Sequence, residues 1–357
     1  MNVPRGNLIE QAVNAVIRPP RRTYDLDSLP LYVEGDDGHH YTRHPVAFTN
    51  KRRQKLVGSV YLDSSQQIMN GGPCIIYLHG NASSQKEGQF LIPNFCSKGV
   101  AVYCFDFAGC GNSGGDYISL GYYETQDLNF LIEMLNFSFN MGPFVLWGRS
   151  MGAATAIMCR NPLVVCKIVD SAYTSIPDVC RAIATSVKLP AIFCPMALWV
   201  LKLQISDKAN FDISTVSALD VAKMPDNVPI LMCHAIDDEF VPFEEGMQLL
   251  NAYSNPDKKL YKTTKGHNGK RSKKWLKQAF EFAFKHLNIK VENDLEVEEF
   301  SSLHESVDHF RSYDDLVRFA KSIPENSEMK DSPIILSEIA RPKYEISRLF
   351  NVTPIPA

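Results

Sequence analysis

One stretch of the sequence decides the fold: Phe144-Val145-Leu146-Trp147-Gly148-Arg149-Ser150-Met151-Gly152. Its first four residues are apolar and predict a buried strand, and residues 153–158 continue at helical spacing. Ser150 therefore stands at the apex of a sharp turn between a strand and a helix, where Gly148 and Gly152 are small enough for the strained backbone. The start of the helix would offer free N–H groups and a partial positive charge. The pattern predicts a nucleophilic serine; the alternative is a structural glycine turn.

A nucleophilic serine needs a histidine as base and an acid that orients the histidine. Where the serine follows a strand and precedes a helix, the acid and then the histidine follow it in the chain. The apolar run 229–233 predicts a strand that ends in an acidic loop, and His267 stands in a loop with glycines on both sides. The predicted order is Ser150, Asp238, His267. Asp237 is the alternative acid, and the Asp-x-x-Val-Pro spacing favours Asp238.

An oxyanion hole is expected between the serine and the loop that follows an upstream buried strand. We assign its two donors to the backbone N–H groups of Asn81 and Met151. His79 and His234 are predicted to be structural. Of the nine histidines, only His267 stands at the right point in the order.

Five ordered motifs resemble those of the serine α/β-hydrolases: Leu78-His79-Gly80-Asn81, Asp106 to Gly115, Gly148 to Gly152, Asp238-Glu239-Phe240-Val241-Pro242 and Gly266-His267-Asn268. Within these enzymes the chain is similar to single-domain eukaryotic hydrolases of the prolyl-aminopeptidase-like or prolyl-oligopeptidase-like kind. Those are similar in turn to the depalmitoylating α/β-hydrolase-domain proteins. The resemblance covers roughly residues 8 to 288. It implies the fold and a cofactor-free catalytic class, but not the substrate.

The N-terminus departs from the depalmitoylating relatives, which carry a cysteine cluster there as a membrane anchor. Residues 1–73 contain no cysteine, and Asn2 stands where N-myristoylation needs glycine. Peripheral membrane contact is therefore supported by no lipidation motif. Residues 8–17 predict an amphipathic helix that packs on the hydrolase body; the alternative is a helix lying on a membrane.

The composition agrees with a cytoplasmic enzyme. In 357 residues, 45% are hydrophobic, which is ample for a large core. The nine cysteines contain no C-x-x-C pair and several fall in predicted strands, which indicates a reducing compartment and no metal site. The formal net charge of −3 gives no reason to expect nucleic acid as a partner.

The predicted architecture is an α/β-hydrolase fold, with a mostly parallel central sheet flanked by helices. Antiparallel strands are expected near 45–49 and 56–62, and parallel strands near 74–78, 100–105, 144–147, 167–169, 229–233 and 259–263. We divide the chain into an N-terminal helix and Pro/Arg linker, the hydrolase domain with a helical lid insertion, and an acidic, partly ordered C-terminal extension; their bounds are 1–30, 31–288 (lid about 171–227) and 289–357. Asp106 is predicted to be structural. The lysine-rich stretch 258–277 is predicted to form a solvated helix face, the alternative being a contact with anionic lipid or with protein.

The lid insertion bears on the substrate. Phe193, Met196 and Trp199 in its apolar centre are expected to line an acyl pocket, although a plain core helix is an equal alternative. The insertion contains no glutamate to bind a free amino terminus, although Asp178 and Asp207 could serve instead, so this counts only mildly against a peptidase.

The sequence thus predicts a serine hydrolase that cleaves an ester or acyl-thioester through an acyl-enzyme, with a small molecule or an acylated protein as substrate. A serine aminopeptidase is the first alternative. A non-catalytic adaptor that kept the fold is the second.

Overall fold

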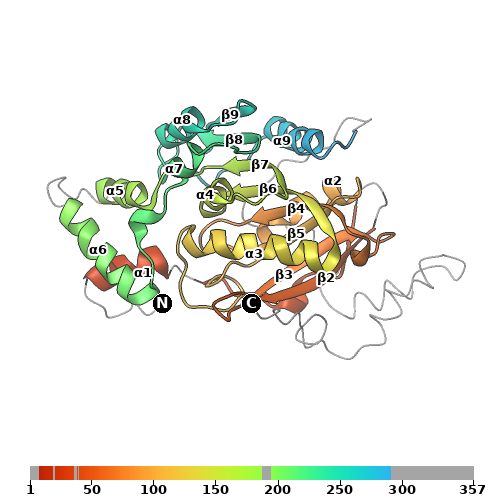
Figure 1. Cartoon of the computed structure of the whole chain (residues 1–357), viewed down its shortest axis with the longest axis horizontal. Coiled ribbons are helices and arrows are strands. Elements are labelled where there is room, and N and C mark those ends of the chain that lie inside the picture. Colours follow the sequence, from red (N-terminus) through yellow and green to blue (C-terminus); the bar gives the residue numbers. More distant parts are fainter. Residues whose placement is uncertain (1–7, 19–20, 36–37, 39, 187–193, 291–357) are drawn as a thin grey trace, which may run out of the picture.

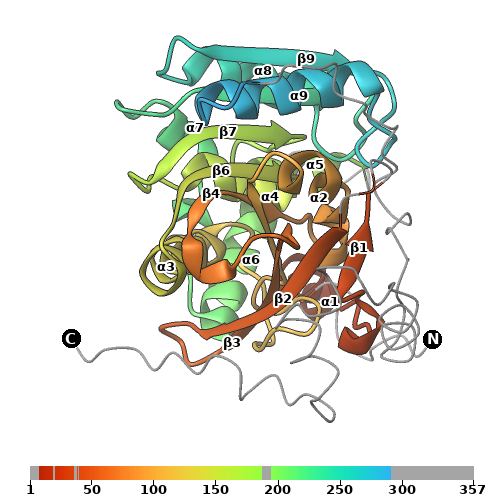
Figure 2. The same ribbon diagram turned by 90° about the vertical axis from the view of Figure 1, so that its right-hand side faces the viewer.

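The computed structural model describes residues 8–18, 21–35, 38, 40–186 and 194–290. Within them, nine strands form a single sheet in the order β1-β2-β3-β5-β4-β6-β7-β8-β9. The strands are β1 (Tyr32–Glu34), β2 (His40–Thr49), β3 (Lys55–Asp63), β4 (Gly72–Leu78), β5 (Ala101–Phe105), β6 (Met141–Arg149), β7 (Val164–Asp170), β8 (Ile230–Ala235) and β9 (Lys258–Thr263). In Figure 2 the labelled strands run from β3 and β2 at the bottom through β4, β6 and β7 to β9 at the top.

Pairing follows the predicted division of the sheet. The strands β1, β2, β3 and β5 pair antiparallel, and β5, β4, β6, β7, β8 and β9 pair parallel. The chain runs from β4 outward to β5 and then crosses back to β6 on the other side of β4. Ligands of open α/β sheets bind at the carboxyl ends of the strands at such a reversal. All eight predicted strands are confirmed, and the short edge strand β1 is an addition.

Helices cover both faces of the sheet (Figure 1). They are α1 (Leu8–Ile17), α2 (Ile92–Cys96), α3 (Tyr122–Phe139), α4 (Met151–Met158), α5 (Ile176–Ser186), α6 (Cys194–Ala209), α7 (Ala218–Ala222), α8 (Phe243–Ala252) and α9 (Lys273–His286), with 3-10 turns η1 (Leu26–Ser28), η2 (Ile68–Asn70), η3 (Gln85–Leu91) and η5 (Ile213–Thr215). The predicted C-terminal extension lies outside the described residues from position 291 onward.

The alternation of side chains along the strands separates two cores. On β4, Ile76 and Leu78 join a cluster with α3, α4, α7 and α8, whereas Ile75 and Tyr77 join a cluster with α2 and α9. Successive side chains of a strand point to opposite faces, so a strand buried on both sides is apolar throughout. For this reason the central strands β4 and β5 stand out in the sequence as continuous apolar runs.

Helix α9 positions the loop that precedes it. Its inner face buries Trp275 and Phe280, and the ring of Phe280 lies 5.2 Å from Phe95 on α2 and 5.5 Å from Trp147 on β6, centroid to centroid. Ser272 caps the helix by accepting the N–H of Trp275 at 3.3 Å. The loop between β9 and α9 is therefore anchored at both ends.

The segment between β7 and β8 contains α5, α6, η5 and α7 and was predicted as the lid. Figure 1 shows α1, α5 and α6 grouped beside one end of the sheet. Val13 and Ile17 of α1 are fully buried, Glu10 pairs with Lys208 of α6 at 3.2 Å, and the carbonyl of Ile17 accepts the N–H of Ile118 at 2.8 Å. The prediction that this N-terminal helix packs on the body is confirmed. Among the described helices, none is long and apolar enough to cross a membrane.

Candidate active site

Ser150 lies in the predicted turn between β6 and α4. Its φ of 52° and ψ of −114° place it in a region that residues other than glycine rarely adopt. A Cβ on Gly148 would overlap the carbonyl of Gly152, and a Cβ on Gly152 would overlap the carbonyl oxygen of Leu78. The N–H of Ser150 donates to the carbonyl of Asp170 on β7 at 2.8 Å. The two glycines are thus required by close backbone approach, and the neighbouring strand holds the strained residue.

The structure brings Ser150, His267 and Asp238 together from loops that follow β6, β9 and β8. His267 Nε2 lies 2.9 Å from Ser150 Oγ, and His267 Nδ1 lies 2.8 Å from Asp238 Oδ2. An ionised carboxylate only accepts, so Nδ1 carries the proton and Nε2 is the acceptor for the serine hydroxyl. This is the geometry of a nucleophile, a base and an orienting acid.

The Asp238 side chain is fully buried. Its Oδ1 accepts the N–H groups of Phe240 at 2.9 Å and Val241 at 2.8 Å. Burial alone would raise the pKa of Asp238, but the bonds from His267 and from these two N–H groups outweigh it and hold the pKa below its usual value. The carboxylate is therefore ionised when it faces the imidazole.

Asp237, the alternative acid, has a different task. It is exposed, and its Oδ1 accepts the N–H of Gly266 at 2.9 Å. Asp237 thus links the loop that carries His267 to the loop after β8, and none of its hydrogen bonds described here reaches the imidazole. Of the two neighbouring carboxylates, Asp238 alone bonds to His267 among the described contacts.

The two predicted oxyanion donors come from different segments: Met151 follows Ser150 in the chain, and Asn81 follows β4. Met151 is the first residue of α4, so its N–H is one of the groups that no intrahelical carbonyl accepts. Asn81 follows β4 in an exposed loop whose start, at Leu78 and His79, touches Gly152. This places the Asn81 loop against the elbow.

The other predicted histidines have structural partners. His79 is fully buried, its Nε2 accepts the N–H of Phe107 at 3.0 Å, and its Nδ1 therefore donates to the carbonyl of Gly80 at 2.7 Å. Burial lowers the pKa of His79, so the ring is neutral. His234 is also buried, with Nε2 2.9 Å from the carbonyl of Val241. The predicted structural role of His79 is confirmed, whereas His234 Nε2 also lies 3.6 Å from Asp238 Oδ2 and so contacts the predicted acid.

Asp106 is likewise structural, as predicted. It is fully buried at the end of β5 and accepts the N–H of Gln85 at 2.7 Å, the N–H of Asn112 at 2.8 Å and the hydroxyl of Tyr24 at 2.7 Å. It joins the loop after β5 to the start of η3 and to the N-terminal segment.

Sequence reasoning missed a buried ion pair beneath the site. Glu87 of η3 bonds to Nε of Arg149 and, at 3.0 Å, to its Nη2. Burial would raise the pKa of Glu87, but the charge and hydrogen bonds of Arg149 outweigh it and lower the pKa to about 2. A Cβ on Gly80 would lie 2.7 Å from Arg149 Nη2, so the guanidinium packs directly against the oxyanion loop. Arg149 is a variable position of the serine motif, and Glu87 lies 62 residues away, so no local pattern indicated the pair.

The predicted substrate-binding side chains are only partly placed. Phe193 lies outside the described residues. Met196 and Trp199 are on α6 and are each 61% exposed. Phe240, which the sequence did not single out for this role, is 63% exposed, and its ring centroid lies 5.5 Å from that of His267.

The acids proposed to bind an amino terminus differ in their surroundings. Asp178 is already bonded to Arg181 at 2.5 Å, to the hydroxyl of Thr174 at 2.8 Å and to that of Ser175 at 2.5 Å. Asp207 is exposed on α6.

The lysine-rich stretch 258–277 is solvated only in part. Lys265, Lys270 and Lys273 are exposed as expected, but Arg271 is 4% exposed. The prediction of a solvated face is wrong for this residue, because its charge is paired inside the protein.

Comparison with known proteins agrees with the geometry. A family model described as serine aminopeptidase, S33 (Hydrolase_4), matches residues 73–184. Lysophosphatidylserine lipase ABHD12 of Danio rerio is 30% identical over 193 residues, covering 52% of this chain and 48% of that protein. The uncharacterised protein YqkD of Bacillus subtilis is 27% identical over 203 residues, covering 54% of this chain and 64% of that one. The chain thus spans about half the length of the lipase.

Solved structures show the same fold. The esterase Pf2001 of Pyrococcus furiosus superimposes with a TM-score of 0.57 at 22% identity, covering 75% of this chain and 99% of that one. Acetyl xylan esterase 1 of a Thermoanaerobacterium species gives a TM-score of 0.54 at 14% identity, covering 78% and 92%. The serine elbow, the mostly parallel sheet and these similarities show that the chain has the α/β-hydrolase fold, and the matched family and lipase make it similar to serine hydrolases of that fold.

Proposed function

We propose that this chain hydrolyses an ester or acyl-thioester through an acyl-enzyme formed on Ser150. The observation that carries the proposal is the unbroken hydrogen-bonded line from Asp238 through His267 to Ser150. It supplies an oriented base at 2.9 Å from a hydroxyl that the strained turn holds at the carboxyl edge of the sheet.

The reaction proceeds in two halves. Ser150 Oγ attacks the carbonyl carbon while His267 Nε2 takes its proton, and the carboxylate of Asp238 stabilises the imidazolium. The oxyanion accepts the N–H groups of Met151 and Asn81 next to the positive end of α4. His267 then gives the proton to the leaving alcohol or thiol. In the second half a water molecule, deprotonated by His267, attacks the acyl-enzyme and releases the carboxylic acid and Ser150.

An acyl chain is the proposed substrate group. Phe240 beside His267, and Met196 and Trp199 on α6, are large apolar side chains that stand exposed at or near the site's lid. The similar lipase is named for a lysophospholipid, which supports an acyl ester over a peptide. A lysophospholipid is one member of the proposed class.

A serine aminopeptidase is the second candidate, and the description of the matching family favours it. Such an enzyme needs an acid to bind the free amino terminus. Asp178 already has Arg181 and two hydroxyls as partners, so it would have to exchange them for the ammonium. We therefore rank the ester reaction first.

The proposal includes a cytoplasmic location. Eight of the nine cysteines are free and buried, where they act as small apolar residues. Such a set is typical of a reducing compartment. Fractionation of cells that express the tagged chain tests it: recovery in a secretory fraction would refute the assignment.

A substrate panel tests the function. We would assay p-nitrophenyl esters from acetyl to palmitoyl, acyl-thioesters, lysophosphatidylserine and aminoacyl-amides, with Ser150→Ala and, as matched control, Ser138→Ala on α3. Loss of the nucleophile is expected to lower kcat on the order of a million-fold, while the control keeps full activity. Turnover of aminoacyl-amides alone would indicate the peptidase. If there is no turnover and a serine-directed fluorophosphonate does not label Ser150, the chain is a non-catalytic adaptor.

A further inference from the structure

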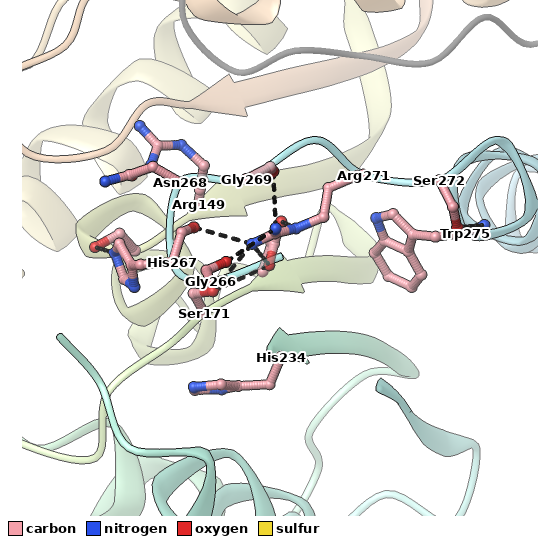
Figure 3. Close-up of polar contacts among 12 residues, drawn as sticks. Arg149, Ser171, His234, Gly266, His267, Asn268, Gly269, Arg271, Ser272 and Trp275 are labelled. Atoms are coloured by element: carbon pink, nitrogen blue, oxygen red, sulfur yellow. Dashed lines mark hydrogen bonds and ion pairs between the residues drawn. The ribbon is translucent and has the colours of Figure 1, made fainter. Parts of the chain in front are cut away.

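The loop between β9 and α9 bends around a buried arginine (Figure 3). Arg271 Nη1 donates to the carbonyls of Gly266 at 3.2 Å and Gly269 at 2.8 Å, and its Nη2 donates to the carbonyl of His267 at 2.9 Å. Three carbonyl groups of one short loop thus converge on a single guanidinium. Arg271 holds the backbone of the histidine itself.

The same guanidinium is fixed on its other side by Asp170, the last residue of β7. Arg271 Nε donates to Oδ2 at 2.6 Å, and Nη2 donates to Oδ1 at 3.1 Å. The backbone carbonyl of Asp170 also accepts the N–H of Ser150. A continuous path of hydrogen bonds therefore runs from the backbone of His267, through Arg271 and Asp170, to the backbone of Ser150.

Burial gives these bonds their weight. Arg271 and Asp170 are 4% and 5% exposed, and a buried charge is costly unless it is paired and fully bonded. Burial lowers the pKa of Arg271, but Asp170 outweighs it, and the pKa stands above its usual value. The guanidinium is charged at every pH at which the enzyme would work.

Lysine could not replace this arginine. A guanidinium has five N–H donors in a rigid fork, and five acceptors at Asp170, Gly266, His267 and Gly269 use all of them, with Ser171 Oγ as a sixth, longer contact at 3.4 Å. An ammonium has three donors and no planar fork, so at least two of the five acceptors would lose their partner.

A second arginine holds the next residue of the loop. Arg149, which precedes Ser150, donates from Nη1 to Asn268 Oδ1 at 2.6 Å. Asn268 is exposed and Arg149 is buried, so this bond joins the exposed part of the loop to the protein interior. Each arginine is neutralised by its own carboxylate, Asp170 or Glu87.

We propose that Arg271 is a positioning residue that sets the distance between His267 and Ser150, with Arg149 and Asn268 as a weaker second hold. The inference rests on the proposed serine hydrolase reaction. Its physical basis is that a shift of about 1 Å in a catalytic group can lower the rate about 100-fold.

The test compares Arg271→Lys, Arg271→Ala and Asn268→Ala with the wild-type chain. The matched control is Arg52→Lys. Arg52 also pairs with a buried carboxylate, at 2.5 Å, but that carboxylate is Asp127 of α3 and does not bond to the histidine loop. The rate of Ser150 labelling by a fluorophosphonate and the kcat and KM for a p-nitrophenyl ester are measured. Each kcat is divided by the number of active sites from burst titration, which removes any misfolded fraction.

We expect kcat per active site of Arg271→Lys to fall about 100-fold with little change in KM, and labelling to slow in parallel. Added guanidinium ion, but not the same concentration of sodium chloride, should restore part of the activity of Arg271→Ala. Asn268→Ala should show a smaller loss of kcat. Arg52→Lys should lower the melting temperature at most.

The outcomes separate the two hypotheses. If the wild-type chain is neither labelled nor active, the proposed function fails. If the wild-type chain is labelled but Arg271→Lys keeps its kcat per site within about twofold, the positioning role is refuted. If neither Arg271 variant folds, Asn268→Ala decides, because its exposed side chain can be truncated safely: an unchanged kcat overturns the proposal.

Discussion

Replacing the acid by its amide, Asp238→Asn, tests the triad at one atom. In the native site, Oδ1 accepts the N–H groups of Phe240 and Val241, and Oδ2 accepts Nδ1–H of His267. Asparagine must place one oxygen and one NH₂ group in these two positions. The oxygen will take the Oδ1 position, because an NH₂ group there would face two donors and forfeit two bonds of about 0.5–1.5 kcal/mol each.

The NH₂ group then faces His267. It can only donate, so Nδ1 must lose its proton and Nε2 must carry one. A protonated Nε2 cannot accept the proton of Ser150, although the two atoms stay 2.9 Å apart. The same change in the best-studied triad lowers kcat about 10⁴-fold, which corresponds to about 5 kcal/mol of activation free energy. We expect a loss of this size in kcat.

The assay is steady-state hydrolysis of the best p-nitrophenyl ester, with Asp237→Asn as the matched control. Asp237 is exposed, and asparagine keeps an oxygen for the N–H of Gly266, so kcat should stay within about twofold of the wild-type value. The reasoning is refuted if Asp238→Asn loses less than about tenfold, or if Asp237→Asn is the more damaging of the two.

Three further outcomes are expected. Gly152→Ala should abolish fluorophosphonate labelling and lower the melting temperature, because the new Cβ overlaps the carbonyl oxygen of Leu78; a labelled, stable variant contradicts the elbow geometry. The ionised Glu87 is stabilising above its unfolded pKa, and this contribution is lost as the pH falls from about 4.5 toward its folded pKa of about 2. In urea unfolding, the free energy of unfolding of Glu87→Ala should therefore be lower than that of the wild-type chain at neutral pH and should change less with pH in that window. If the two free energies depend on pH in the same way, the pairing of Glu87 with Arg149 does not stabilise the fold. Trp199→Ala should raise KM for long-chain esters and leave acetyl esters unaffected, and equal effects on both would remove α6 from the acyl site.

The arrangement of strands could be predicted from the sequence because local chemistry decides it. A parallel strand covered on both faces must be apolar throughout, and the run 144–147 is buried on both sides of the sheet. The serine turn could be predicted from the two glycines that flank Ser150, because a side chain at Gly148 or Gly152 would collide with backbone atoms. The chain order of serine, acid and histidine left four of the nine histidines, at 267, 286, 304 and 309, and the glycines on both sides of His267 favoured that one.

Tertiary structure alone decided the partners of the buried charges. Asp237 and Asp238 are adjacent and chemically identical, and only the turn that gives Asp238 the N–H groups of Phe240 and Val241 directs it to His267. Arg271 stands among lysines in the sequence and resembles a solvated residue, but its partner Asp170 lies 101 residues earlier.

The physical reason for this division is the range of the interactions. Hydrophobic periodicity and steric limits on glycine act within a few residues, so they leave a pattern in the sequence. An ion pair depends on which charged side chains the fold brings together, and the separations of 62 residues for Glu87 and Arg149 and of 101 for Asp170 and Arg271 leave no such pattern. The sequence by itself predicted the strands and the serine elbow and favoured Asp238 over Asp237; only the folded chain shows which carboxylate bonds to His267 and which arginines bond to its loop.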